Sequence, residues 1–399
     1  MWSRKHCQVI TALLLGCISV NSFLHYQETS DIPPDHCSNK LHCHQPAAAV
    51  FDILASHEGV VEPSVYVTIT KGAPVTLYCS FPTKEAKNLK PEQGLSQSQR
   101  HTALLHHDYK MNLIFRRRAD AYGRFFDHVA QDLSLQFNFS FVTVLRDDCT
   151  LKTITSEALF QAGHFFGTFS HQGPINADRV LSVPDHRFID TQGFHSLMST
   201  LKSLDTPFLN KSHSLFWRGT SSGSKVACLD ILRVQIALKL KHVSAANFKI
   251  SKPKVCELNN TYLDFDKAGI FGDYAAEAEW IKHRAIIDVD GNFATNGLPW
   301  RVLSGSVLFR VTSHNYGWIE DLLEPHVHFI PIKSDLSDLL EATRLAATTD
   351  PTELAMLAKI AQNAQNLRDR LSYSSVVKHF ALAVNRLTEL RIKMKATRQ

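Results

Sequence analysis

Short apolar runs alternate with amphipathic stretches through most of the chain. The apolar runs predict strands over residues 137–145, 214–217, 285–289, 307–311 and 327–332. The amphipathic stretches predict helices over residues 151–166, 222–241, 297–303 and 334–347. Strands that alternate with helices at this spacing are typical of parallel sheets of the doubly wound type. The pattern therefore predicts an α/β fold.

Two local signals outside this pattern each predict a further element. Residues 65–69 and 75–78 are apolar runs on either side of Lys71 and Gly72, which predicts a β-hairpin. Asp350, Pro351 and Glu353 combine an acidic cap, a proline at the first helical position and a glutamate at the third. Long helices are expected from there onward.

The N-terminus has the layout of a secretory signal. Arg4, Lys5 and His6 precede an apolar stretch over residues 7–24. About 18 residues is marginal for spanning a bilayer, so a cleaved signal peptide and a retained signal-anchor both remain open. Positive charge before the stretch favours a cytoplasmic N-terminus and a lumenal body. We expect a single-pass type II membrane protein of the Golgi or endoplasmic reticulum.

Cysteines and glycosylation sequons agree with that compartment. Two of the eight cysteines lie in the apolar stretch, and the other six are widely spaced without a C-x-x-C pair. Those six could form up to three disulfide bonds, and their spacing does not fit a zinc site. The sequons at Asn210 and Asn259 could be glycosylated in the lumen, whereas the sequon at Asn138 lies in a predicted strand and is a poorer acceptor.

Composition and charge restrict the class of ligand. Hydrophobic residues make up 44% of the chain and charged residues 20%, a balance typical of globular proteins. The net charge of +5 comes from scattered lysines and arginines, which is compatible with an anionic ligand and argues against a nucleic acid.

Parallel sheets bind ligands beyond the carboxyl ends of their strands, and Arg218 stands at such an end. Gly219 and small residues follow it and are predicted to turn into a helix. Backbone N–H groups at a helix start attract phosphate, and an arginine there adds a bidentate charged clamp. The alternative is an arginine that forms structural contacts at the strand end.

A second predicted strand, residues 285–289, leads into a glycine-containing loop. Thr295, Asn296 and Gly297 follow as another possible anion-binding helix start, with Arg301 one turn further along. The side chain of Arg301 could instead face solvent.

Acidic residues end two of the predicted strands. Asp147 and Asp148 follow the first strand, where a general base could reach an acceptor hydroxyl, or where acids could cap the next helix. Asp288 and Asp290 have the D-x-D spacing of some metal sites. Because they end a buried strand and Asp290 begins an ordinary turn, we expect no metal there.

Several stretches, in this order, resemble the capsule-associated and lipopolysaccharide-modifying glycosyltransferases, glycosyltransferase family 90, which includes the protein O-glucosyltransferases. The matching stretches are VLRDD, LSVPDHRF, LFWRG, IIDVDGN, LSGSVLFRV and WIEDLLEPHVHFIPIKSDLSDL, within about residues 100–385. The last is the most specific, since HFIPI followed by DL copies the family's H-Y-x-P-x…D-L pattern.

The resemblance implies two facing Rossmann-like lobes of the GT-B type. We divide the chain into a signal-anchor or signal peptide at 1–24, a stem and linker at 25–100, an acceptor-side lobe at 101–205, a nucleotide-sugar-binding lobe at 206–347 and C-terminal helices at 348–399.

The resemblance also implies an inverting, metal-independent transfer from UDP-glucose or UDP-xylose, with no further cofactor. The acceptor would be a hydroxyl of a protein, a polysaccharide or a glycolipid. Asp147 matches the family's base, with Asp148 as the alternative, and Arg218 with Gly219 matches the motif that holds UDP. Arg301 is a candidate for the second UDP-binding arginine, because ATNGLPWR departs from the family's Ser-x-Arg pattern.

A catalytically inactive lectin-like or scaffold protein with the same fold is the alternative function, because a fold alone does not determine function. Retention of both the acid and the arginine favours an active enzyme.

We predict that Asp147→Asn lowers turnover about 10²–10⁴-fold and leaves UDP binding intact, because only the base is lost. Steady-state rates and UDP titration calorimetry of the Asp147→Asn and Asp148→Asn variants check this. An active Asp147→Asn variant beside an inactive Asp148→Asn variant would move the base to Asp148.

Overall fold

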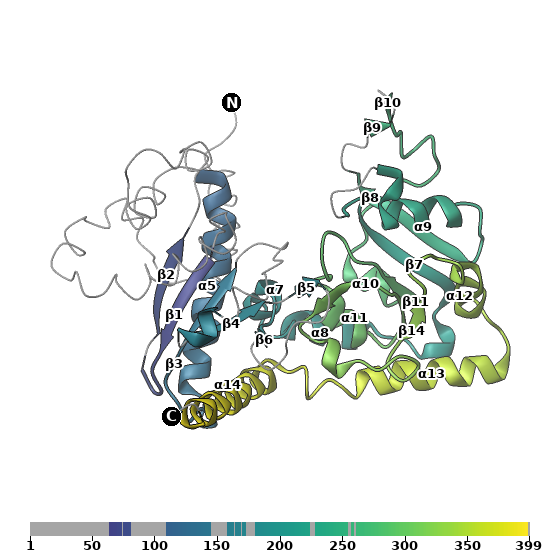
Figure 1. The fold of residues 1–399 in the computed structure, drawn as a ribbon. Helices are drawn as coiled ribbons and strands as arrows, with labels where there is room; N and C mark the ends of the chain where they lie inside the picture. Colours follow the sequence, from purple (N-terminus) through teal and green to yellow (C-terminus); the bar gives the residue numbers. More distant parts are fainter. Residues whose placement is uncertain are drawn as a thin grey trace, which may run out of the picture. The chain divides into compact units, whose positions relative to one another are not determined.

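The described part of the computed structural model has two five-stranded sheets flanked by helices, with two small two-stranded sheets beside them, and confirms the α/β class (Figure 1). It describes residues 64–73, 75–80, 109–144, 158–162, 164–168, 170–172, 180–223, 228–253, 257–258 and 261–397. All of these fall within one compact unit, residues 47–399. The predicted signal-anchor lies outside the described residues. Among the helices that are described, none is both long and apolar enough to cross a membrane.

The predicted hairpin is confirmed and forms one side of the first sheet. Its strands β1 (Ser64–Ile69) and β2 (Thr76–Ser80) pair antiparallel. β1 also pairs antiparallel with β3 (Phe139–Val144) over its full length. Residues 64–80 therefore contribute strands to this sheet, although composition suggested a stem up to residue 100.

The other side of the first sheet is parallel. β3 pairs with β4 (Phe165–Thr168), and β4 pairs with β6 (Val180–Ser182), both in parallel register. The carboxyl ends of these three strands consequently lie at the same edge of the sheet.

Two helices that are distant in the sequence pack together against the first sheet. These are α5 (Tyr109–Gln131) and α14 (Tyr373–Ala396), the last helix of the chain. The ring centroid of Phe380 on α14 lies 5.3 Å from that of Phe125 on α5 and 5.5 Å from that of Phe141 on β3. The C-terminal residues therefore complete the core of the first sheet.

The second sheet is entirely parallel, with the strand order β14-β12-β11-β7-β8. Its strands are β7 (Ser212–Thr220), β8 (Ala246–Lys252), β11 (His283–Asp288), β12 (Val307–Val311) and β14 (Ile330–Ile332). Every residue of β11 and β12 is buried, as expected of central strands covered on both faces. The predicted doubly wound parallel sheet is confirmed here.

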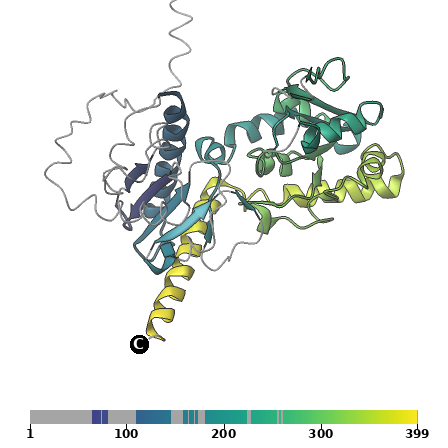
Figure 2. The same cartoon turned by 45° about the horizontal axis from the view of Figure 1, so that its top comes forward.

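Further helices and short elements flank or connect the two large sheets (Figure 2). The helices are α7 (His186–Asp190), α8 (His195–Leu204), α9 (Leu232–Leu240), α10 (Glu277–Trp280), α11 (Leu298–Val302), α12 (Leu339–Ala346) and α13 (Pro351–Gln365). Of these, α7 packs against α5. The short strands are β5 (Ser170–Gln172), β9 (Glu257–Leu258), β10 (Thr261–Tyr262) and β13 (Asn315–Gly317), and single 3₁₀ turns occur at Phe208–Asn210, Cys228–Asp230 and Glu320–Leu322.

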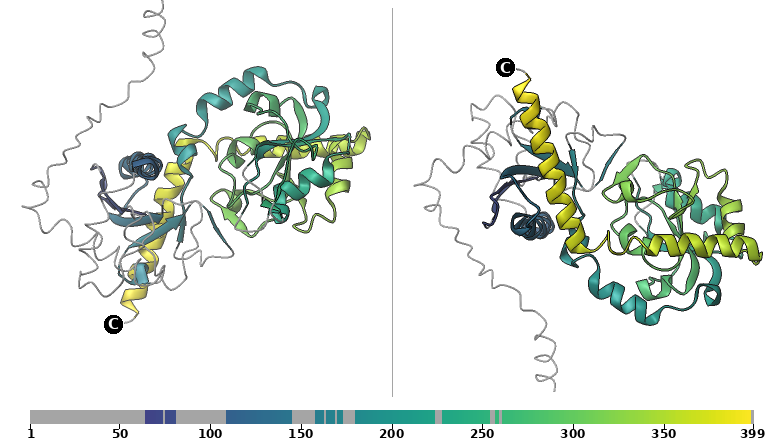
Figure 3. Two further views of the ribbon diagram at one scale, coloured as in Figure 1. Left: turned by 90° about the horizontal axis from the view of Figure 1, so that it is seen from above. Right: turned by 90° about the horizontal axis from the view of Figure 1, so that it is seen from below.

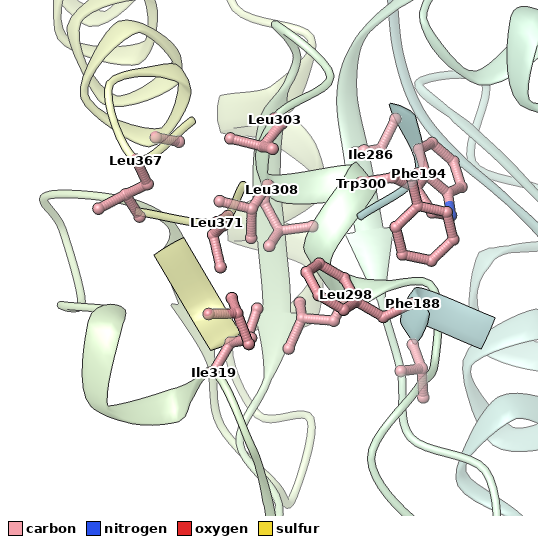
Figure 4. Packing of buried hydrophobic residues seen from close by; sticks show 14 of the residues in the cluster. Phe188, Phe194, Ile286, Leu298, Trp300, Leu303, Leu308, Ile319, Leu367 and Leu371 are labelled. Carbon is pink, nitrogen blue, oxygen red and sulfur yellow. The ribbon is translucent and has the colours of Figure 1, made fainter. Parts of the chain in front are cut away.

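The two C-terminal helices pack in different places. α13 contacts β12 of the second sheet, and α14 contacts α5 and β6. Figure 3 shows them as successive yellow helices separated by a bend. Leu367 and Leu371 in that bend are buried near Leu308 of β12 (Figure 4). The cap that was predicted for α13 is confirmed, since the Asp350 carboxylate accepts hydrogen bonds from the N–H groups of Thr352 and Glu353.

Three predicted helices have wrong boundaries. The helix predicted over 151–166 overlaps β4, where Phe165 and Phe166 are buried in the sheet. The helix predicted from residue 222 begins at Leu232, and Ser222 lies in a loop where its hydroxyl bonds with Thr220 and Arg233. The helix predicted from residue 334 begins at Leu339, because Leu336 adopts a left-handed backbone conformation with φ of 59°.

We predict that Phe380→Ala lowers the free energy of unfolding by about 3–5 kcal/mol, because it removes a buried ring from a packed cluster. Leu382→Ala on the same helix is the control, since Leu382 is 45% exposed. Urea denaturation of both variants measures the effect. Equal destabilisation by the two substitutions would contradict the packing described for α14.

Candidate functional site

The strand order of the second sheet places a topological switch point between β7 and β11. β7 comes first along the chain, and the strands that follow it, β8 and β11, lie on its opposite sides. In sheets of this order ligands bind beyond the carboxyl ends of the strands at the switch point. The loops after Thr220 and after Asp288 therefore frame the candidate site.

Arg233 on α9 joins these two loops. Its Nη1 donates hydrogen bonds to Ser222 Oγ at 2.7 Å and to the carbonyl oxygen of Thr220 at 3.2 Å. Its Nε and Nη2 donate to the carbonyl oxygen of Val289 at 3.1 and 2.7 Å. Arg233 is only 8% exposed, so one buried guanidinium fixes the separation of the loops.

The charge of Arg233 has no hydrogen-bonded counter-ion among the described residues, where its acceptors are all carbonyl or hydroxyl oxygens. Burial, and next the charge of Arg301, lower the pKa of Arg233 to about 10, which leaves it protonated at neutral pH. A buried charge is costly unless an opposite charge compensates it. An anion bound at the ends of the two loops would provide that compensation.

Sequence reasoning missed Arg233, although the pattern of α9 contains a signal. Arg233 occupies the same helix stripe as the buried residues Ile236, Ala237 and Leu240. A charged residue at a core position of an amphipathic helix needs buried hydrogen-bond acceptors or an opposite charge. Here the acceptors are oxygen atoms of the two loops of the candidate site.

Arg218 lies at the end of β7, as predicted, but its side chain turns back along the sheet. Its Nη1 donates to the carbonyl oxygens of Trp217 and Asn247, each at 2.8 Å, and its Nη2 donates to Asn247 Oδ1 at 2.7 Å. The guanidinium carbon lies 4.8 Å from the ring centroid of Phe216. Burial lowers the pKa of Arg218. These contacts match the structural alternative considered for this residue.

Gly219 packs too closely against its neighbour to carry a side chain. A Cβ atom there would lie 2.6 Å from Cζ2 of Trp217. Residues 221–223 are not helical, and α9 starts at Leu232. The part that Arg218 and Gly219 would play in binding UDP stays a prediction.

Thr295 and Arg301 converge on one buried acid. Thr295 Oγ1 donates to Asp288 Oδ1 at 2.7 Å, and Arg301 Nη1 forms an ion pair with the same oxygen. The Arg301 guanidinium also lies 4.6 Å from a ring centroid of Trp280. Gly297 directly precedes α11, as predicted, and the helix is only five residues long. Arg301 is brought to the switch point with one of its nitrogens already paired.

Asp288 and Asp290 lie among further charges at the same edge. Asp288 Oδ2 is 3.9 Å from Nε of Arg310, which forms a bidentate ion pair with Glu320. Asp290 accepts a hydrogen bond from Asn315 at 3.2 Å. Burial, and next the charge of Asp288, raise the pKa of Asp290 to about 6. In the part of the chain that the structure describes, no three His, Cys, Asp or Glu side chains form a group that could hold a metal ion.

The predicted base falls outside the described residues. Asp147 and its alternative Asp148 come shortly after Val144, the last residue of β3. Their assignment remains a prediction. β3 does end at the edge of the first sheet where the parallel strands β4 and β6 also end.

A small pocket adjoins the loop that carries Thr295 and Asn296. Its other polar lining residue is Asp185, and Trp318 forms part of the wall. Asp185 comes shortly after β6, and Trp318 follows β13. The pocket thus brings predicted UDP-binding residues next to an acid and an aromatic ring for which the sequence suggested no role.

Comparison with known proteins identifies the family. A model of "Glycosyl transferase family 90" matches residues 189–398. Protein O-glucosyltransferase 2 of Danio rerio is 28% identical over 209 residues, which are 51% of this chain and 38% of that protein. Protein O-glucosyltransferase 3 of Homo sapiens is 26% identical over 169 residues, which are 42% of this chain and 31% of that protein. The chain therefore matches well under half the length of these relatives.

We predict that Asp290→Asn changes stability in a pH-dependent way. The native pKa of about 6 lies above the unfolded value, so wild-type stability is fully present below about pH 4 and falls as Asp290 ionises up to about pH 6. Relative to wild type, the variant should gain about 2–3 kcal/mol between pH 4 and pH 7.5. Urea denaturation at both pH values measures this. A pH-independent difference would contradict the buried, ionisable state of Asp290.

Proposed function

This chain belongs to glycosyl transferase family 90, and we propose that it transfers glucose or xylose from a UDP-sugar to an acceptor hydroxyl. The family and the relatives named protein O-glucosyltransferase support glycosyl transfer in general. The resemblance of the quoted motifs to the family supports UDP as the leaving group. Two facing lobes of the GT-B type, one for the donor and one for the acceptor, are part of the proposal.

The observation that carries the proposal is the bridge that Arg233 makes between the two loops of the switch point. In the proposal, the diphosphate of the donor lies at the ends of these loops. Its negative charge compensates Arg233, and the hydroxyls of Thr220 and Ser222 are near enough to contribute hydrogen bonds. Arg218 lies against the ring of Phe216, and Arg301 lies against Trp280, which contacts Phe216. In the proposal, both arginines add positive electrostatic potential at the diphosphate.

The proposed reaction is a single displacement with inversion. The acceptor oxygen attacks the anomeric carbon while Asp147 takes its proton. The bond from the anomeric carbon to the diphosphate oxygen breaks, and UDP leaves with the electron pair. Preorganised positive groups that face the leaving diphosphate stabilise the charge that develops on it. In the sequence, Asp147 comes shortly after β3, which ends at the same edge as β4 and β6.

We propose that arginines take the place of a metal ion in stabilising the diphosphate. Asp288 supports this, because Arg301 and Thr295 already occupy one of its oxygens and Arg310 lies near the other. A carboxylate compensated in this way is a poor ligand for an additional cation.

The acceptor in this proposal is a protein hydroxyl, as the names of the relatives suggest, with polysaccharides and glycolipids as the other possibilities. We place the reaction in the lumen of the secretory pathway, behind an N-terminal signal or anchor. Cys228 forms a disulfide bond and Asn210 is an exposed sequon residue, and both features suit that compartment.

The decisive experiment measures UDP release by the full-length protein with a panel of UDP-sugars, with and without EDTA. Hydrolysis of UDP-glucose or UDP-xylose that persists in EDTA is expected. Loss of activity in EDTA would overturn metal independence. UDP binding without turnover, even with acceptor proteins, would favour the inactive lectin-like or scaffold alternative, and absence of UDP binding would overturn the proposed function.

We predict that Arg233→Lys weakens UDP binding at least about tenfold, because a lysine cannot span both loops and presents a single charged nitrogen. Lys239→Ala is the control, since Lys239 is exposed on the same helix. Calorimetric titration with UDP measures the effect. Unchanged UDP affinity in Arg233→Lys would remove Arg233 from the donor site.

A further inference from the structure

A partly buried hydrogen bond joins the segment after β6 to the segment after β13. Trp318 Nε1 donates to Asp185 Oδ2 at 3.2 Å. The indole also makes an edge contact with Phe188 of α7, with the ring centroids 4.6 Å apart. We call the pair Asp185 and Trp318 the indole bridge.

The two oxygens of Asp185 serve different segments. Oδ1 accepts hydrogen bonds from the backbone N–H groups of Arg187 and Phe188 and so caps α7, while Oδ2 accepts from Trp318. Asp185 is 1% exposed. Only a carboxylate can accept on both sides at once, because an amide has a single acceptor oxygen.

The segment that carries Trp318 is also fixed to the donor side of the candidate site. Asn315 donates to Asp290, and the N–H of Gly317 donates to Glu320, the partner of Arg310. A Cβ atom on Gly317 would lie 3.1 Å from Cβ of Ala294, which adjoins Thr295. Residues 315–318 are therefore packed directly against the loop proposed to hold the donor.

The same segment pairs with residues that follow a strand of the first sheet. β13 pairs antiparallel with β5, with Asn315 opposite Gln172 and Gly317 opposite Ser170. β5 comes after β4, Asp185 comes after β6, and Asp147 comes after β3. Since these three parallel strands end at one edge, β5 and Asp185 follow strands that end at the same edge as β3.

We infer that Asp185 and Trp318 are positioning residues that hold the carboxyl ends of the parallel strands of the first sheet against the donor loop. This inference rests on the proposed function. Neither side chain is assigned a part in bond making. Their hydrogen bond, together with the β5–β13 ladder, sets the distance between the acceptor hydroxyl and the anomeric carbon.

The expected consequence is a loss of rate without a loss of donor affinity. A displacement of about 1 Å between reacting groups can cost about 10²-fold in rate. The hydrogen bonds that Arg233 makes to the two loops involve neither Asp185 nor Trp318, so we expect donor affinity to change much less than the rate of transfer.

The test compares Trp318→Phe, Asp185→Asn and Asp350→Asn in the full-length protein. Trp318→Phe keeps the ring contact with Phe188 and removes the indole N–H donor. Asp185→Asn keeps one acceptor oxygen for the cap of α7 and leaves none for the indole. Asp350→Asn is the matched control, because Asp350 caps α13 with the same two-bond geometry and makes no bridge.

For each variant, kcat for sugar transfer, the ratio of donor hydrolysis to transfer, the Kd for UDP and the melting temperature are measured. Both bridge variants are expected to lower kcat about 10- to 100-fold and to raise the hydrolysis ratio, with UDP Kd within about twofold of wild type. The Asp350→Asn control is expected to transfer sugar at the wild-type rate.

The outcomes separate the inference from the function on which it rests. Wild-type kcat in both bridge variants, or a loss of UDP affinity that parallels the loss of kcat, would overturn the inference alone. If Asp185→Asn and Asp350→Asn lower the melting temperature equally and the hydrolysis ratio is unchanged, Asp185 only caps α7 and the inference is overturned. A wild-type protein that neither binds UDP nor hydrolyses any donor would overturn the proposed function and the inference together.

Discussion

Buried charge is the constraint around which the carboxyl edge of the second sheet is built. Taking an ion out of water costs several kcal/mol unless an opposite charge or several hydrogen bonds replace the water. Asp288 is compensated by Arg301, and Arg310 is compensated by Glu320. Arg233 instead donates its hydrogen bonds to carbonyl and hydroxyl oxygens of two loops. The positions of both loops therefore follow from the need to solvate one guanidinium.

The parts of the fold that could be predicted are those whose signal is local or strongly apolar. β12 was predicted with its observed bounds because all five of its residues are buried. The hairpin of β1 and β2 and the cap at Asp350 depend on neighbouring residues alone. β8 was not predicted, because it lies at the edge of its sheet and its residues alternate between buried and partly exposed.

Sequence reasoning could choose a place for the candidate site, but it could not specify the side-chain pairings there. The rule for parallel sheets led to the ends of β7 and β11, where the switch point lies. The direction of the Arg218 side chain depends on Asn247 of the neighbouring strand, and the partner of Arg301 is Asp288, which was considered for a different role. Such pairings link residues far apart in the sequence, and no pattern in the chain specifies them.

The route of α14 has a consequence for synthesis of the protein. The ribosome delivers the chain from its N-terminus, and domains generally fold in that order. The cluster around Phe125 and Phe141 lacks one ring until Phe380 has been made. The sheet that is first in the sequence must therefore wait for the second sheet and for α13 before its own core closes. Until then its apolar surface is available to chaperones.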